Sequence, residues 1–185
     1  LTESGVVTGL ACNKDGRTTA CMGVASGDLN GDRLLDLFVT NYKGEAKLLY
    51  LQDPGGWFSD AVAGTGLLAP GLPYVGWGTQ FLDADNDGQL DIAAANGHVA
   101  DFREEGVEYE MPTQFFHNHG DGTFEELTPD VVGPFFAEKI FGRSLATLDR
   151  NVDGRTDFAL SAIASPAALL TNQTSDAGNF FAIRL

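Results

Sequence analysis

The first residues to consider for chemistry are DADNDGQLD at positions 83–91, with aspartates at the first, third, fifth and ninth places. Carboxylates so close in sequence repel one another unless they lie in water or share a cation. A hard cation such as Ca2+ takes about six to eight oxygen ligands, mostly carboxylates and carbonyls. The stretch therefore has the composition of a calcium loop, or of a polar turn between strands.

The same spacing occurs in DLNGDRLLD from Asp28 and in DRNVDGRTD from Asp149. Side chains at positions 1, 3, 5 and 9, with the backbone carbonyl at position 7, could surround one ion in each stretch. The predicted ligands are Asp28, Asn30, Asp32, Leu34 and Asp36 in the first loop, Asp83, Asp85, Asp87, Gln89 and Asp91 in the second, and Asp149, Asn151, Asp153, Arg155 and Asp157 in the third. Three copies in one register favour metal binding over ordinary polar turns.

Position 6 distinguishes the three loops. It is glycine at Gly88 and Gly154, where a sharp turn with positive φ costs little. The first loop has Arg33 there, and a residue with a side chain costs on the order of 1 kcal/mol in that conformation. The first loop is therefore predicted to be the weakest of the three sites.

The loops do not have the pattern of an EF-hand, which places a glutamate at position 12 between two helices. Position 12 is Val39, Ala94 or Leu160, each in a predicted strand. Mg2+ suits the loops less well than Ca2+ because it keeps several waters. We predict up to three structural Ca2+ ions, since a catalytic metal needs an open position and nearby acid–base groups that the motif does not supply.

Strand-like segments surround each acidic loop in the same order. One segment precedes the loop, the next begins inside it, and two more follow, the last of them led by an aromatic residue. In loop order these are MGVASG, LDLFVTNY, AKLLYLQD and GWFSDAV; GWGTQFL, LDIAAANG, TQFFHNHG and GTFEEL; and GRSLATL, TDFALSAI, AALLTNQT and NFFAIRL. The order predicts an all-β fold of β-propeller-type blades, made of three four-stranded antiparallel repeats.

The predicted blades cover residues 22–63, 76–128 and 142–185. Residues 1–21 occupy the place of a connection between blades, and residues 99–112 are an acidic insertion in the middle blade. A propeller usually needs about four to eight blades to close. We therefore expect further blades from a longer chain, or closure by a homo-oligomer.

The formal net charge of −15 argues against nucleic acid and anionic membranes as partners. The sequence has no run of eighteen apolar residues and so predicts no membrane span. The first residues lack a signal-peptide pattern, which does not by itself indicate the cytoplasm. Cys12 and Cys21 could form a small disulfide loop or remain two thiols, and their spacing does not decide between these.

Several other residues have two interpretations. His117 and His119 share one face of a predicted strand, where surface histidines are commoner than a metal pair. Asn172 begins a glycosylation sequon. Trp57 and Trp77 could stack on sugars, although packing within blades is their commoner use. No serine-nucleophile motif is present, so we expect no enzyme activity.

GVASGDLNGDRLLDLFVTNY, GWGTQFLDADNDGQLDIAAANGH and FFHNHGDGTFEEL resemble the FG-GAP/VCBS repeat proteins. ANGHV and LLTNQTSDAGNFFAIRL resemble more specifically the ASPIC/UnbV branch, whose C-terminal domain would begin near NFFAIRL. The resemblance implies integrin-α-like β-propellers with calcium in the blade loops, and an extracellular, periplasmic or cell-surface location. Arg33, Asn30, Asn151 and the small number of blades depart from the family pattern.

The function that follows is a non-catalytic, calcium-stabilised propeller module for extracellular recognition or adhesion, with an unidentified protein or glycan as partner. The transfer of partner binding rests on analogy between folds. The alternative is a carbohydrate-binding or enzyme-accessory module that uses Trp57 or Trp77.

Overall fold

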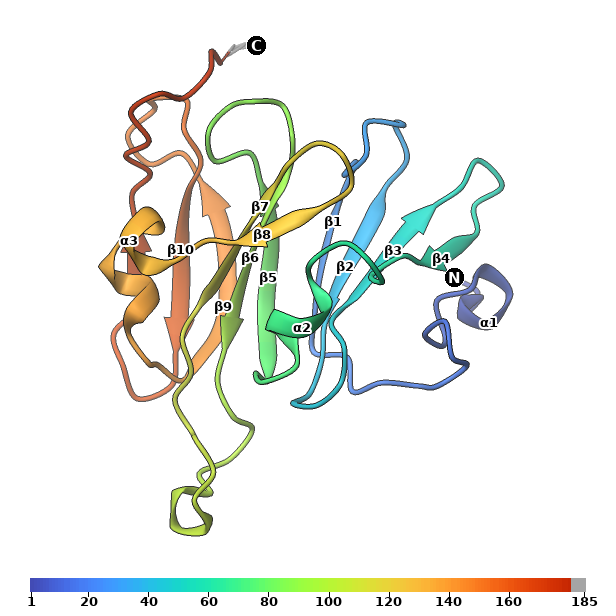
Figure 1. The fold of residues 1–185 in the computed structure, drawn as a ribbon, viewed down its shortest axis with the longest axis horizontal. Coiled ribbons are helices and arrows are strands. Elements are labelled where there is room, and N and C mark those ends of the chain that lie inside the picture. The colour runs from blue at the N-terminus through green and yellow to red at the C-terminus, as the bar shows by residue number, and fades with distance from the viewer. Residues whose placement is uncertain (181–185) are drawn as a thin grey trace.

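The computed structural model describes residues 1–180 and consists of three antiparallel sheets that stand side by side (Figure 1). In each sheet, strands that follow one another in sequence are neighbours. The strands are β1 (Gly23–Gly27), β2 (Asp36–Thr40), β3 (Leu48–Gln52) and β4 (Phe58–Asp60); β5 (Gly76–Leu82), β6 (Asp91–Asn96), β7 (Gln114–Asn118) and β8 (Phe124–Glu126); and β9 (Gly142–Leu148), β10 (Asp157–Ala162) and β11 (Ala168–Leu170). The predicted all-β fold of propeller-like antiparallel repeats is confirmed.

The third sheet has three strands within residues 1–180. Its fourth strand was predicted at NFFAIRL, which lies mostly at 181–185, outside the described residues. Over the part of the chain that the structure describes, the three sheets form an open series rather than a closed ring (Figure 1).

The helices are short and lie in connections. They are α1 (Gly5–Thr8), α2 (Leu68–Gly71) and α3 (Pro129–Val132), with the 3-10 turns η1 (Arg103–Glu105) and η2 (Pro134–Ala137). None of the helices among residues 1–180 has the length and apolar character needed to cross a membrane.

The register of the first two strands places each acidic loop at the end of a hairpin. The last residue of the first strand pairs with position 9 of the motif, in the pairs Gly27 with Asp36, Leu82 with Asp91 and Leu148 with Asp157. All three loops therefore lie at the same end of their sheets, which is the upper end in Figure 1.

Apolar side chains fill the space between neighbouring sheets. Phe38 and Leu49 of the first sheet pack with Ile92 and Phe116 of the second, and Leu67 of the connecting segment completes this cluster. The second and third sheets are joined in the same way by a cluster that includes Ala93, Phe115, Leu145, Phe158 and Phe136. In both clusters the connecting segment inserts a large side chain between the sheets. The connection therefore contributes to the packing of neighbouring blades in addition to joining them covalently.

The N-terminal residues lie on the other face of the first sheet. Leu10 packs against a cluster formed by Val39, Leu48 and Tyr50. The Tyr50 hydroxyl donates to the carbonyl oxygen of Cys12 at 3.2 Å. Residues before β1 therefore cover part of a sheet face that has no neighbouring blade within residues 1–180.

A lysine is buried beside the connection between the first two sheets. Lys47 is fully buried, and its Nζ donates to the carbonyl oxygen of Gly71 at 3.0 Å. Burial disfavours the charged amine and lowers the pKa of Lys47 to about 8, against a smaller opposing effect of Glu126. The amine is thus held by a backbone carbonyl at a cost in solvation.

This burial predicts that the free energy of unfolding rises as the pH increases from about 8 to about 9.5. Below pH 8 the native and the unfolded state both carry the proton on Lys47, so the residue adds no pH dependence to the free energy of unfolding. Above it the unfolded state, with the ordinary pKa of 10.5, binds more protons than the native state, and stability rises by about 1 kcal/mol per pH unit. Urea denaturation at several pH values measures the slope.

Lys47→Met should remove most of this slope, whereas Lys43→Met, at an exposed position, should keep it. A slope that persists in Lys47→Met would contradict the assignment.

Candidate metal sites

The three acidic loops share one backbone conformation. Positions 4 and 6 have positive φ in every loop, with values of 77° and 70° at Gly31 and Arg33, 57° and 88° at Asn86 and Gly88, and 59° and 80° at Val152 and Gly154. Arg33 takes the left-handed conformation predicted for position 6, where the other loops have glycine. The requirement at position 4 was missed, because Asn86 and Val152 give no signal comparable with glycine.

The aspartate at position 1 organises each turn from inside. Asp83 Oδ1 accepts from the amide of Asp87 and its Oδ2 from the amide of Gly88, both at 3.0 Å. Asp149 makes the same two bonds in the third loop, at 3.1 and 3.0 Å. In the first loop Asp28 Oδ2 accepts from the amide of Arg33 at 2.8 Å. The motif therefore folds its own backbone around the first carboxylate.

The aspartate at position 9 joins the loop to the third strand. The position-9 side chain is buried in all three loops, at Asp36, Asp91 and Asp157. Its Oδ2 accepts a hydrogen bond from the backbone amide at position 2. Its Oδ1 accepts one from a backbone amide at the end of the sheet's third strand or just beyond it. The position-2 donors are Leu29, Ala84 and Arg150, at 3.0, 3.2 and 3.1 Å. The other donors are Gln52, Asn118 and Asn172, at 3.0, 2.9 and 2.8 Å.

Burial also changes the acidity of two of these carboxyls. It raises the pKa of Asp91 to about 6, against hydrogen bonds and the nearby His117 that lower it. The pKa of Asp36 is raised for the same reason. His117 Nδ1 lies 3.1 Å from Asp91 Oδ1. His117 therefore supports a buried member of the motif.

The middle loop gathers the most negative charge. Among residues 1–180, one carboxylate oxygen from each of Asp83, Asp85 and Asp87 lies within 4.8 Å of the others. No lysine or arginine forms an ion pair with these three side chains in that part of the chain. Oxygen donors at this density match the ligand preference of a hard divalent cation. The middle loop therefore fits the predicted ion.

The first loop contains a buried carboxylate oxygen without a partner among residues 1–180. Asp28 Oδ1 is buried and accepts no hydrogen bond within residues 1–180. Such acceptors are rare in folded proteins and usually have a water or ion as partner. At position 3 the Asn30 amide donates to Asp32 Oδ2 at 3.0 Å. The first loop thus fits a cation, despite the strained backbone at Arg33.

The third loop contains its own cation. Arg155 donates to Asp153 Oδ2 through Nε at 3.1 Å and through Nη2 at 2.5 Å. Asn151 Nδ2 donates to the same oxygen at 2.8 Å. The hydrogen bonds from Arg155 lower the pKa of Asp153 to about 2. A metal ion here must compete with the guanidinium, an effect that the spacing of the motif does not reveal.

The two tryptophans noted in the sequence, and the histidine His98, differ in their surroundings. Trp77 Nε1 donates to the Gly97 carbonyl oxygen at 2.7 Å, and the Arg143 guanidinium lies 4.1 Å from the Trp77 ring centroid. Trp57, in contrast, is 52% exposed. His98 is buried, with its ring nitrogens near the carbonyl oxygen of Ala100 and the Tyr42 hydroxyl.

The structure also places the two cysteines and the pair of histidines on β7 and just after it. Cys12 and Cys21 are free thiols in the structure. The rings of His117 and His119 are 5.3 Å apart and perpendicular, and these side chains contact Asp91 and Glu125 respectively. Both histidines therefore have acidic neighbours of their own.

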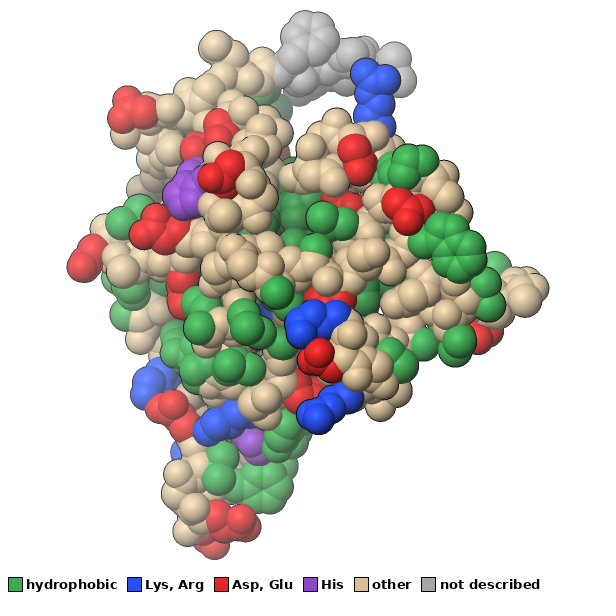
Figure 2. Space-filling model, turned by 45° about the vertical axis from the view of Figure 1, so that its right-hand side comes forward, with side chains coloured by type: hydrophobic (Ala, Val, Ile, Leu, Met, Phe, Trp, Pro, Cys, Tyr) green, Lys and Arg blue, Asp and Glu red, His purple; other side chains and the backbone are tan. Residues whose placement is uncertain are grey.

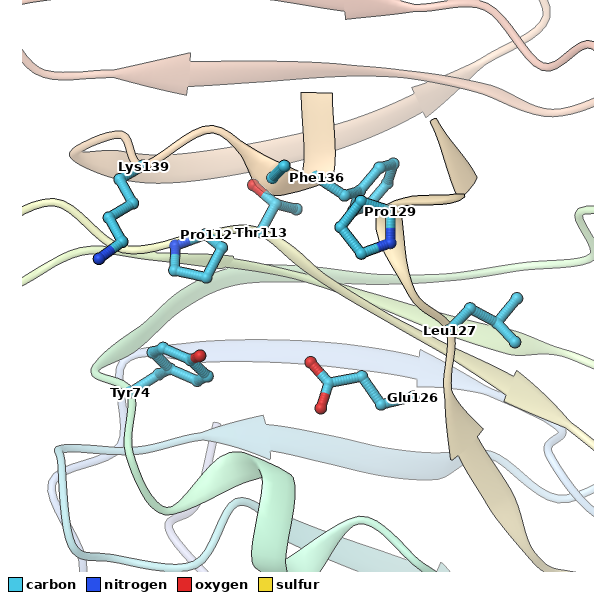
Figure 3. Close-up of a pocket in the computed structure, with 9 residues that line it drawn as sticks. Tyr74, Pro112, Thr113, Glu126, Leu127, Pro129, Phe136 and Lys139 are labelled. Atoms are coloured by element: carbon cyan, nitrogen blue, oxygen red, sulfur yellow. The ribbon is translucent and has the colours of Figure 1, made fainter. Parts of the chain in front are cut away.

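A cavity of about 270 Å3 lies away from the acidic loops (Figure 3). Tyr74 and Glu126 line one side, and Pro112, Thr113 and Pro129 line the other. Thr113 is 3% exposed, and its hydroxyl has no partner among residues 1–180. The cavity includes no residue of the three motifs and is separate from the candidate metal sites.

Residues 28–94 match the family model described as the FG-GAP-like repeat. The chain carries an FG-GAP-like repeat. The matched residues run from the first acidic loop to β6 and contain both the first and the middle loop. The third loop lies outside the match, yet it shares the backbone conformation and the position-9 hydrogen bonds of the two matched loops. No curated protein matches the chain.

The strained backbone at position 4 gives a testable prediction. Val152 is β-branched, has a φ of 59° and is 63% exposed. Val152→Gly should relieve strain while losing little packing, and should raise the free energy of unfolding by about 0.5–1 kcal/mol after the entropy of the unfolded chain is included. Urea denaturation in EDTA measures this without a contribution from bound metal.

Val131→Gly is the matched control, since Val131 is also exposed but lies in α3. Glycine should lower stability there by a few tenths of a kcal/mol, which is roughly the difference in helix propensity between valine and glycine. If Val152→Gly is destabilised as much as Val131→Gly, position 4 is not strained.

Proposed function

We propose that the protein is a calcium-binding, non-catalytic propeller module that serves extracellular recognition or adhesion. The FG-GAP-like repeat and the three sheets make it a β-propeller-like repeat module. The observation that carries the calcium proposal is the convergence of Asp83, Asp85 and Asp87 without a neutralising side chain. Bound calcium would supply the missing positive charge.

In the middle loop the ion would be held by Asp83, Asp85, Asp87 and Asp91 and by the carbonyl oxygen of Gln89. The chain prepares this arrangement through the amides that fix Asp83 and Asp91. The equivalent residues of the first and third loops would hold up to two further ions, in competition with Arg155 in the third. The ions would stabilise the fold and take no part in a reaction.

An extracellular, periplasmic or cell-surface location agrees with this role, because exposed calcium loops of moderate affinity fill where calcium is abundant. We also propose the ASPIC/UnbV branch, on the sequences ANGHV and LLTNQTSDAGNFFAIRL. Part of the second sequence lies beyond the described residues.

A partner would have an accessible feature to bind at the insertion of residues 99–112. This segment projects from the lower end of the molecule in Figure 1, opposite the acidic loops. Figure 2 shows acidic and hydrophobic side chains together at this tip. The carboxylates there are Asp101, Glu104, Glu105, Glu108 and Glu110. We propose the insertion as the contact for an unidentified protein or glycan.

Calcium should raise the melting temperature, because a ligand that binds only the folded state stabilises it. At a calcium concentration about one hundred times Kd, the expected rise is roughly 5–10 °C. Differential scanning calorimetry in EDTA and across a calcium titration measures it. An identical melting temperature in EDTA and in excess calcium would overturn the proposal.

The double variant Asp85→Asn and Asp87→Asn should lose a large part of this rise. The matched control is Asp53→Asn with Asp121→Asn, which removes the same charge from two turns outside the motifs. The control should respond to calcium as the unaltered protein does. An equal loss in both double variants would mean a general charge effect.

The exposure of Trp57 favours carbohydrate binding as the second candidate. In that case Trp57→Ala should abolish signals on a glycan array and leave the melting temperature unchanged. Trp77→Ala should instead lower the melting temperature, because Trp77 bonds to Gly97 and packs on Arg143. Absence of any glycan signal from the unaltered protein removes this candidate.

A further inference from the structure

The segment after β11 leaves its own sheet and contacts the acidic loop of the neighbouring one. Asn172 Nδ2 donates to the carbonyl oxygen of Ala84 at 2.6 Å. The amide of Gly178 donates to the carbonyl oxygen of Asp85, also at 2.6 Å. Ala84 and Asp85 are positions 2 and 3 of the middle loop. In Figure 1 this red segment runs at the upper end, where the acidic loops lie.

Asn118 shows that the repeat itself does not require this contact. Like Asn172, it donates its backbone amide to the position-9 aspartate of its own loop. Its side-chain amide, however, bonds to Leu90 of the same repeat, at 3.1 Å. The Asn172 side chain makes its shortest bond to the adjacent repeat instead, with a longer one of 3.4 Å to Thr156 in its own.

The side chain of Asn172 is held in this orientation. Its Oδ1 accepts from the amide of Thr174 at 3.0 Å and from the Thr174 hydroxyl at 2.8 Å. Arg155 Nη1 in turn donates to the carbonyl oxygen of Thr174 at 2.9 Å. Both ends of the carboxamide are thus engaged, and one of them makes a contact between repeats.

Two further features hold the middle loop from outside, one in this segment and one in the third loop. A Cβ at Gly178 would lie 2.1 Å from the carbonyl oxygen of Asn86, so only glycine allows the backbone to approach this closely. Asn86 Nδ2 donates to the carbonyl oxygen of Gly154 at 3.3 Å, which joins the middle loop to the third. Positions 2, 3 and 4 of the middle loop are therefore all held from outside.

We propose that residues 171–178 are a clamp on the middle loop and that Asn172 is a positioning residue for its metal site. This rests on the proposed calcium binding. The clamp fixes the backbone from Ala84 to Asn86, which lies between Asp83 and Asp87. Fixing it holds the carboxylates together before the ion arrives and so lowers the entropy cost of binding. By linkage, calcium strengthens the docking of the clamp by the same factor.

The test measures calcium affinity of the middle loop alone, by isothermal titration calorimetry. Asp28→Asn and Asp149→Asn form the background, because they remove the position-1 ligand from the other two loops. In this background Asn172→Ala and Gly178→Ala should each weaken calcium binding by about tenfold, within the usual range of coupling between sites. Asp176→Asn is the matched control in the same segment, and its binding should be unchanged.

Hydrogen exchange supplies a second readout. Calcium should slow exchange at the amide of Gly178, which donates to the middle loop, and the Asp85→Asn and Asp87→Asn double variant should lose this protection. If the background protein does not bind calcium, the proposed function of the loop fails. If it binds calcium while Asn172→Ala and Gly178→Ala bind equally well, the clamp is overturned and calcium binding stands. Should Asn172→Ala fail to fold, Gly178→Ala decides, since it removes no side-chain contact.

Discussion

The repulsion between carboxylates in one tight turn is the constraint on which the rest of this structure depends. The fold meets it with backbone amides. Both oxygens of the buried aspartate at position 9 accept hydrogen bonds from backbone amides. The aspartate at position 1 accepts one or two further amide hydrogen bonds. These bonds fix the turn and leave positions 3 and 5 to set the remaining charge. These hydrogen bonds set the conformation of the turn, and a bound ion would relieve the repulsion between the carboxylates.

The three loops share one backbone conformation but differ in how far the negative charge at positions 3 and 5 is neutralised. The middle loop keeps Asp85 and Asp87 and has no internal cation. The first and third replace the acid at position 3 with asparagine, which donates to the aspartate at position 5. The third adds Arg155 as an internal cation. The middle loop therefore has the most uncompensated negative charge for a cation to neutralise. Glycine at position 6 alone would rank the third loop, with Gly154, equal to the middle loop, with Gly88.

The sequence was sufficient for the features that depend on spacing. The order of strands around each motif predicted twelve strands, and the eleven that lie within residues 1–180 are present, because alternation and turn residues repeat with the motif. The sequence was not sufficient where a side chain chooses between partners. Asn118 and Asn172 look equivalent in their repeats, yet one bonds within its own repeat and the other reaches across. The positive φ at Val152 was also missed, since a β-branched residue in that conformation contradicts local preference and is imposed by the loop.

Contact between neighbouring loops changes what calcium could do for a recognition module. The insertion at residues 99–112, which we propose as the partner contact, lies at the opposite end of the sheets from the acidic loops. In repeat proteins, stability is approximately the sum of each repeat and its interface with the next. The contacts of Asn172, Gly178 and Asn86 belong to such an interface, between the second and third sheets. An ion in the middle loop would therefore stiffen the junction between two blades. The effect would reach the proposed partner surface through the strands that begin at the loops and end near the insertion.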